Sequence, residues 1–256
     1  MRDIFLPEQP RLPVYINNRN RLTMTKKLVE WLEKIPYAVP VVIDNDSGYK
    51  PLIDWYGFAY QDLLVFLSQN MGPYSFFKPY DIRIRYGRDL YSSIYRSLFD
   101  LAPEWFVYTD PDLLPIEECP LEAIEVFHRL MIEYPDKQKV GFGLKIDDIP
   151  DHYPAKAEVI AWEKSLVSKE IRGKTAVEAN IDTTFALYKK SRWSKMDPVG
   201  RCLRTTYPYL CRHLPWYVDP NNLDEEEKFY MANASEAATW SNRIAEIAKE
   251  KENAAK

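Results

Sequence analysis

Cysteine is scarce in this sequence, and its distribution excludes several classes of protein. Cys119, Cys202 and Cys211 are an odd number of cysteines, and their spacing matches no zinc motif. Such sparse usage does not suit a disulfide framework, whereas a few reduced thiols are typical of a reducing cytosol. We therefore expect a cytoplasmic protein.

Long apolar segments are also missing. No run approaches the roughly 20 apolar residues that cross a bilayer, and the N-terminal MRDIFLPEQPRLP lacks the apolar centre of a signal peptide. We expect no transmembrane segment and no secretion signal. If the substrate is linked to a membrane, the protein acts on it from the cytosolic face.

Basic residues are not in excess. The 34 Lys and Arg residues stand against 38 Asp and Glu residues, and the formal net charge is −4. Proteins that bind nucleic acid usually carry a basic excess, so we expect no nucleic-acid partner. The 256 residues, 46% of them hydrophobic and 28% charged, suit a globular domain with an ample core.

Glycine-rich phosphate-binding motifs are absent as well. The sequence contains neither G-x-G-x-x-G nor G-K-[ST], which argues against a dinucleotide-binding domain and against a P-loop. In the first half we predict strands at 14–16, 41–43, 62–67 and 105–108, and helices at 23–34 (with Thr23 as N-cap), 51–59 and 89–99. This alternation is typical of a doubly wound parallel sheet.

The second half of the chain is patterned differently. We predict a helix at 117–134, strands at 140–146 and 181–188, and a helical, increasingly polar end from Asp224. Gly141 and Gly143 indicate a close approach of another backbone or a bulge. No internal repeat or low-complexity linker divides the chain. We therefore expect a single domain.

Two carboxylates follow the strand predicted at 105–108. Pro111 cannot continue a central strand, so the chain turns there, with Asp110 and Asp112 just past the strand end. In open α/β sheets, ligands bind at this edge. Two close carboxylates repel each other unless a cation lies between them, and a divalent cation is the simplest candidate. The alternative is an ordinary polar turn.

With these residues in place, the chain resembles the GT-A fold glycosyltransferases, especially small bacterial and viral ones. Four segments carry the resemblance, in the expected order over about residues 12–116: the loop at 17–21, VVIDNDSG at 41–48, the turn at 70–73 and YTDPDLLP at 108–115. The resemblance implies a Rossmann-like, mainly parallel central sheet flanked by helices. About 12–116 would form the nucleotide-sugar and metal-binding half, about 117–223 the acceptor half, and 224–256 a C-terminal helix with a frayed tail.

The resemblance also implies an activity. A glycosyltransferase of this kind moves a hexosyl or related sugar from a nucleotide-sugar donor to a hydroxyl of a glycan or lipid-linked acceptor, as in polysaccharide biosynthesis. We expect a UDP-sugar first and a GDP-sugar second. Mn²⁺ or Mg²⁺ would neutralise the leaving diphosphate, with Asp112, Asp110 and His213 as its ligands. The residues implied in contact with the nucleotide sugar are Asn18, Arg19, Arg21, Asp44, Asp46, Asn70, Arg88 and Asp110.

An inverting enzyme needs, in addition, a general base that deprotonates the acceptor hydroxyl. Asp182 ends a polar stretch before an apolar run and is our first candidate. Glu178 is a weaker candidate, and Asp147, Asp148 and Asp151 compete with both. A retaining enzyme would not use such a base in the same way, and the sequence leaves the stereochemistry open.

Two other functions occur on the same fold. A nucleotidyltransferase that makes sugar nucleotides usually carries a glycine-rich loop after the first strand, and no glycine lies between Val14 and Ser47. The other alternative is a non-catalytic nucleotide-binding or sugar-binding module. The intact pair of Asp110 and Asp112 argues against that module.

Overall fold

The computed structural model describes residues 11–90, 93–171, 173–181, 185–193, 201–234, 242–244 and 246–247. Its helices are α1 (Leu22–Leu32), α2 (Lys50–Phe58), α3 (Leu98–Leu101), α4 (Ala123–Glu133), α5 (Lys156–Ser165) and α6 (Glu225–Ala232), with short 3₁₀ helices η2 (Gly72–Tyr74), η3 (Lys190–Arg192) and η4 (Leu214–Tyr217). Its strands are β1 (Leu12–Asn18), β2 (Ala38–Asp44), β3 (Leu63–Leu67), β4 (Tyr80–Tyr86), β5 (Asp89–Leu90), β6 (Ile94–Arg96), β7 (Trp105–Thr109), β8 (Leu113–Pro115), β9 (Lys139–Gly141), β10 (Gly143–Leu144), β11 (Val167–Glu170), β12 (Ala176–Ala179), β13 (Ala186–Lys189), β14 (Cys202–Thr205) and β15 (Leu210–His213).

A mixed 12-stranded sheet forms the centre of the molecule. The strand order is β11-β12-β14-β9-β13-β7-β1-β2-β3-β4-β5, with β6 paired to β4. The strands β7, β1, β2 and β3 are parallel neighbours. The strands predicted at 14–16, 41–43 and 105–108 therefore lie side by side. In register, Asn18 faces Asp44 and Ile16 faces Thr109. The carboxyl ends of these strands therefore meet at one edge, as a doubly wound sheet requires.

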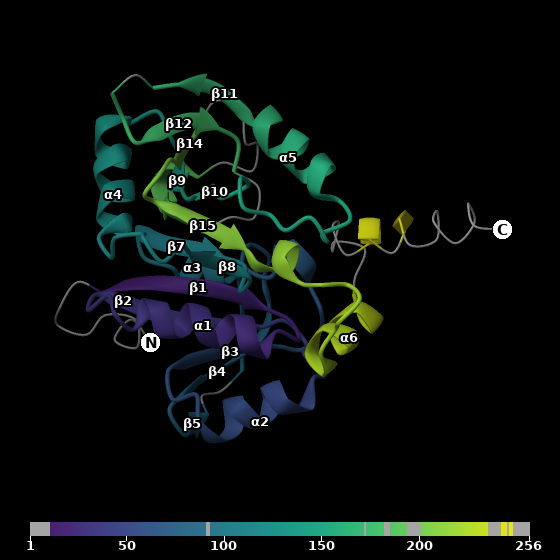
Figure 1. The fold of residues 1–256 in the computed structure, drawn as a ribbon. Coiled ribbons are helices and arrows are strands. Elements are labelled where there is room, and N and C mark those ends of the chain that lie inside the picture. The colour runs from purple at the N-terminus through teal and green to yellow at the C-terminus, as the bar shows by residue number, and fades with distance from the viewer. Residues whose placement is uncertain are drawn as a thin grey trace.

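Outside this parallel centre the sheet is largely antiparallel. Strand β13 is inserted between β7 and β9 and runs antiparallel to both, while β14 is parallel to β9. The expected mainly parallel sheet is thus confirmed at its centre, and its flanks are mixed. Strands from both predicted halves of the chain belong to this one sheet (Figure 1).

Apolar side chains cover both faces of the sheet. On one face, α1, α2 and α4 bury residues such as Leu28, Tyr56 and Phe127 against the strands. The spacing of apolar residues in these helices gives each a single buried side, which is why they lie flat on the sheet. On the other face, aromatic side chains around Phe76 and Phe106 form a second core.

A small three-stranded sheet, β10-β15-β8, lies beside the first core. Two glycines connect it to the large sheet. A Cβ on Gly141 would lie 2.4 Å from the Phe185 carbonyl oxygen, and one on Gly143 would lie 2.3 Å from the Thr205 carbonyl oxygen. The close backbone approach expected from these glycines is confirmed.

The segment predicted as a helix at 89–99 is mostly strand. The alternating apolar residues of β4 continue into an antiparallel hairpin with β5, β6 pairs with the other end of β4, and only Leu98–Leu101 is helical. Apolar residues four apart suggested a helix, but pairing with an exposed sheet edge determined the outcome. Arg88 consequently lies in the β4–β5 turn, where Gly87 N–H donates to the Gln61 carbonyl before β3. That is the edge opposite the carboxyl ends of the parallel strands.

Three other predicted boundaries shift. The helix predicted at 117–134 begins only at Ala123. In the segment predicted as a strand at 181–188, the strand begins at Ala186, and residues 182–184 lie outside the described residues. The N-cap of α1 is Arg21 rather than Thr23, and Arg21 makes no capping side-chain bond.

The predicted helical end is confirmed in α6. The Asp224 carboxylate caps this helix by accepting a hydrogen bond of 2.8 Å from Glu227 N–H. Helix α6 lies at the N-terminal end of α1, where Glu226 accepts a hydrogen bond from Thr23 N–H (Figure 1). None of the helices in the described part of the chain has the length and apolar character to cross a membrane.

Candidate functional site

Two of the three predicted metal ligands, Asp112 and His213, lie next to each other near the carboxyl end of β7. Asp110 and Asp112 follow this strand, and the His213 Nε2 atom lies 3.5 Å from Asp112 Oδ2. Both side chains are mostly covered, at 19% exposure for His213 and 17% for Asp112. His213 also packs against the Trp216 ring, with centroids 4.7 Å apart.

The small sheet brings Asp112 and His213 together across a long sequence separation. After the turn at Pro111, β8 pairs antiparallel with β15, and this register places His213 opposite Leu113. The next residue, Leu214, donates its backbone N–H to the Asp112 carbonyl at 2.8 Å. Backbone pairing on both sides of the two ligands therefore fixes their separation.

The chemistry of this pair fits a divalent cation. Among the described residues, the buried Oδ1 atom of Asp112 has no hydrogen-bond partner. A bare buried carboxylate oxygen is costly unless a cation or donor is supplied. Two ligand atoms about 2.1 Å from one cation lie about 3–3.5 Å apart, which matches the Asp112–His213 distance. The described residues contain no group of three or more His, Cys, Asp or Glu side chains that could hold a metal.

Asn45 links the loops at this edge, and sequence reasoning did not single it out. Its amide nitrogen donates to the Asn17 side-chain oxygen (3.2 Å) and the Gly72 carbonyl (3.1 Å), and its oxygen accepts from Met71 N–H (2.7 Å). The predicted residue Asn70 closes the adjacent turn by accepting from Gly72 N–H at 2.9 Å. These bonds hold the ends of β1, β2 and β3 as one unit.

Asn18 and Asp44 are buried at the paired ends of β1 and β2. Asn18 donates to the Tyr56 hydroxyl at 2.8 Å, and Asp44 accepts from Ser47 N–H at 3.1 Å. Burial raises the pKa of Asp44, although hydrogen bonds from Ser47 and Tyr56 oppose the shift. Asp46 by contrast is exposed and has a left-handed φ of 63°. Asp44 thus shapes the loop that presents Asp46.

Two of the three arginines predicted to contact the nucleotide sugar, Arg19 and Arg21, contact the α6 region. The guanidinium group of Arg21 forms an ion pair with Glu227 at 2.5 Å and lies 3.4 Å from the centroid of the Tyr230 ring. Arg19 donates to the Asn233 carbonyl at 2.7 Å. Sequence reasoning missed the involvement of α6, although Glu227 and Tyr230 are three residues apart and so share one helix face.

Glu226 from α6 supplies the cap that α1 lacks. Its carboxylate accepts from Thr23 N–H at 3.0 and 3.1 Å and from the Thr23 hydroxyl at 2.7 Å. The positive end of α1 is therefore occupied by a carboxylate of the same chain. Such a helix end would otherwise be a place for a ligand phosphate.

The edge carries an excess of negative charge. Among the described residues placed at this edge, carboxyl groups outnumber guanidinium groups: Asp44, Asp46, Asp110, Asp112, Glu226 and Glu227 against Arg19 and Arg21. An anionic ligand is repelled from such a surface unless a cation accompanies it. The charge balance therefore matches the fit of Asp112 and His213 to a divalent ion.

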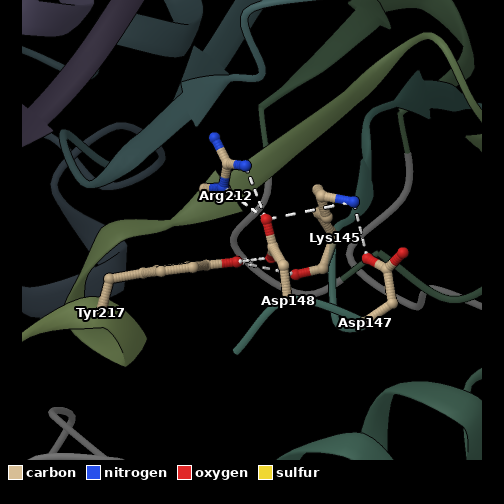
Figure 2. A network of polar contacts seen from close by, with 5 residues as sticks. All are labelled: Lys145, Asp147, Asp148, Arg212 and Tyr217. Carbon is tan, nitrogen blue, oxygen red and sulfur yellow. Dashed lines mark hydrogen bonds and ion pairs between the residues drawn. The ribbon is translucent and has the colours of Figure 1, made fainter. Parts of the chain in front are cut away.

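A polar network surrounds Arg212, the residue before His213 in β15. Figure 2 shows Arg212 from β15 and Tyr217 from η4 converging on Asp148. Both Nε and Nη2 of Arg212 donate to Asp148 Oδ2, at 3.0 and 2.6 Å, and the Tyr217 hydroxyl donates to Oδ1. Burial works against the charged form, but the bonds from Tyr217 and Arg212 hold the pKa of Asp148 below its usual range. This carboxylate is suited to positioning β15 rather than to accepting a proton.

The other candidate bases are placed differently. Asp147 and Asp151 are exposed and pair with Lys145 and Lys156. Glu178 pairs with Lys137 at 3.0 Å on β12, separated from β7 by β14, β9 and β13. The structure does not bring Glu178 to the edge that carries Asp112. Asp182 lies outside the described residues.

Two hydrogen bonds hold Asn180 and Ile181, the last described residues before Asp182. Lys139 donates to the Ile181 carbonyl at 3.0 Å, and Arg204 donates to the Asn180 carbonyl at 2.7 Å. After the gap, Ala186 pairs opposite Tyr108 near the end of β7.

Comparisons with known proteins give little further information. No protein-family model matches the chain, and no curated protein matches it. Among solved structures, the crystal structure of S. aureus TarS is similar at 13% sequence identity, covering 93% of this chain and 42% of that chain, with a TM-score of 0.45. This chain thus spans less than half the length of that one. At this TM-score the similarity carries no argument about the function of the present chain.

Proposed function

We propose that this chain is a metal-dependent glycosyltransferase that moves a sugar from a nucleotide-sugar donor to an acceptor hydroxyl. The buried Asp112 oxygen without a partner among the described residues, next to His213, carries the proposal. The parallel strand ends beside it support the proposal, because ligands of open α/β sheets bind at this edge.

Asp112 and His213 would hold Mn²⁺ or Mg²⁺ together with the donor diphosphate. Mg²⁺ sites commonly use one or two carboxylates plus substrate phosphates, so a two-residue protein site is sufficient. When bound, the ion supplies Lewis-acid stabilisation of the departing diphosphate. Asp110 contributes a second carboxylate at the same strand end, through water or to the ribose.

The nucleoside part of the donor would lie over the linked ends of β1, β2 and β3. Asn45 fixes these loops to one another, and Asp44 fixes the turn that follows β2. Asp46 is exposed at that turn and is our candidate for the base or ribose contact. We keep a UDP-sugar as first candidate and a GDP-sugar as second.

The acceptor, a glycan or lipid-linked glycan, would approach from the second half of the chain. There the Asp148–Arg212 pair holds β15, which carries His213. Asp182 remains our candidate for the base that deprotonates the acceptor hydroxyl in an inverting reaction.

A thermal-shift panel tests the proposal. UDP, GDP and CMP are each added to the full chain with and without Mn²⁺, and product analysis with a panel of activated sugars follows. We expect one nucleotide to raise the melting temperature only when Mn²⁺ is present, because the edge alone is too negative to hold a diphosphate. Shifts of equal size without metal, or no shift with any nucleotide, would overturn the proposal.

A further inference from the structure

Helix α6 is joined to the candidate site by more contacts than a peripheral C-terminal helix would need. Glu226 caps α1 at Thr23, and Glu227 pairs with Arg21. Phe229 packs on Tyr49 with ring centroids 5.2 Å apart. Each contact joins α6 to a segment at the carboxyl edge of the parallel strands. Helix α6 is therefore held in one position over that edge.

Within this contact, the Tyr230 ring lies 3.4 Å from the Arg21 guanidinium, just past the carboxyl end of β1. Burial raises the pKa of Tyr230, Arg21 opposes the shift, and the charges of Asp112 and Asp110 add to it. The phenol therefore stays protonated at neutral pH and can donate a hydrogen bond at this edge of the sheet.

The Arg21 guanidinium holds the phenol in place and does not compete for the same ligand oxygen. Its charge is already balanced by Glu227 at 2.5 Å. Burial would lower the pKa of Arg21, but the bond and charge of Glu227, and the charges of Tyr230 and Asp112, raise it. Arg21 is thus a permanent cation whose flat face orients the Tyr230 ring.

We propose that α6 forms one wall of the donor site and that the Tyr230 hydroxyl donates a hydrogen bond to an anionic oxygen of the metal-bound nucleoside diphosphate. This inference rests on the proposed function and adds a binding group to it. A neutral phenol suits this place because it supplies a donor without adding charge to a surface that already holds several carboxylates.

The test compares Tyr230→Phe with wild type by titration calorimetry in the presence of Mn²⁺. The probes are the nucleoside diphosphate that gives the largest metal-dependent shift in the thermal panel, and the corresponding nucleoside without phosphates. Phenylalanine keeps the stack on Arg21 and removes only the hydroxyl. Tyr86→Phe is the matched control, because Tyr86 is exposed at the opposite edge of the sheet.

We expect Tyr230→Phe to weaken diphosphate binding about ten-fold, the effect of losing one hydrogen bond to a charged group. Its nucleoside affinity and the affinities of Tyr86→Phe should stay at wild-type values. Unchanged or tighter diphosphate binding by Tyr230→Phe would overturn the inference while the proposed function stands. An equal loss for the nucleoside would overturn it too, since the contact would not be to phosphate. Absence of metal-dependent binding in wild type would instead refute the proposed function itself.

Discussion

Replacing Glu226 with alanine should release the contact between α6 and α1. The carboxylate accepts three hydrogen bonds from Thr23, two from the backbone N–H and one from the hydroxyl, at 2.7 to 3.1 Å. Glu226 is only 6% exposed, so water does not replace it easily. Arg21 at the N-cap makes no capping bond of its own. The substitution therefore removes the only side-chain cap described for α1.

The expected loss follows from two known effects. Removing a helix cap costs about 0.5–2 kcal/mol, and a hydrogen bond to a charged group is worth about 1.5–3 kcal/mol. Because the bonds to Thr23 share one carboxylate, they are not additive, and we expect a total of about 2–3 kcal/mol. For a chain of this size that lowers the melting temperature by about 4–12 °C.

The assay is differential scanning calorimetry combined with hydrogen exchange. Glu226→Ala should melt earlier than wild type, and amides in α6 and the first turn of α1 should exchange faster. Glu225→Ala is the control, because Glu225 is 85% exposed and its pair with Lys228 is a surface ion pair, so its effect should stay within about 0.5 kcal/mol. A Glu226→Ala protein with wild-type melting and exchange would refute the described docking of α6.

Three further outcomes are expected. Gly141→Ala should lower the free energy of unfolding by about 1–3 kcal/mol through overpacking, and with it the melting temperature, because the new Cβ would meet the Phe185 carbonyl. The control is Gly57→Ala, whose Cβ has no atom of the described residues within 4 Å and which should stabilise α2 by up to about 1 kcal/mol. Equal effects of the two substitutions on the melting temperature would refute the packing described. Asp44→Asn should raise the melting temperature at pH 7.5 and should have no such effect in acid. A buried carboxyl group with a raised pKa contributes stability at low pH, and the wild-type protein loses this contribution as pH rises through that pKa. A difference in melting temperature that does not change with pH would contradict this. Asp182→Asn should lower turnover about 10²–10⁴-fold with little change in nucleotide affinity, and steady-state kinetics showing normal turnover would exclude Asp182 as the base.

Local patterns predicted the parallel centre of the fold. Apolar runs of three or four residues predicted the buried strands around Val14, Val41 and Phe106, and patterns typical of helices predicted α1, α2 and α4. These elements are determined by burial of their own residues, so a sequence pattern is enough to find them. The glycines at 141 and 143 indicated a close backbone approach or a bulge, and the structure shows the close approach at both.

The pairing of strands that are distant in the sequence could not be predicted in the same way. Strand β13 inserts between β7 and β9, and the segment after Arg88 adds to a sheet edge instead of forming a helix. Both outcomes depend on which edges are unpaired elsewhere, which local periodicity does not record. The capping of α1 by Glu226 is a similar case, since Thr23 looked like a local N-cap and receives its carboxylate partner from a distant helix.

For the candidate site, residue types were more predictable than their partners. Asp112 and His213 do lie next to each other, as the resemblance implied. Arg21, expected on the nucleotide sugar, is held by Glu227, and the candidate base Glu178 on β12 is held by Lys137. Both pairs form because covered charges need counter-ions, and those counter-ions lie far away in sequence.

The position of a bound manganese ion tests the central claim most directly. Crystals of the full chain grown with Mn²⁺ and the nucleoside diphosphate selected by the thermal panel would be measured at the manganese absorption edge. We predict an anomalous peak within about 2.2 Å of both an Asp112 carboxylate oxygen and His213 Nε2. A nucleotide bound at this edge with no manganese peak there, or a peak away from both side chains, would contradict the account.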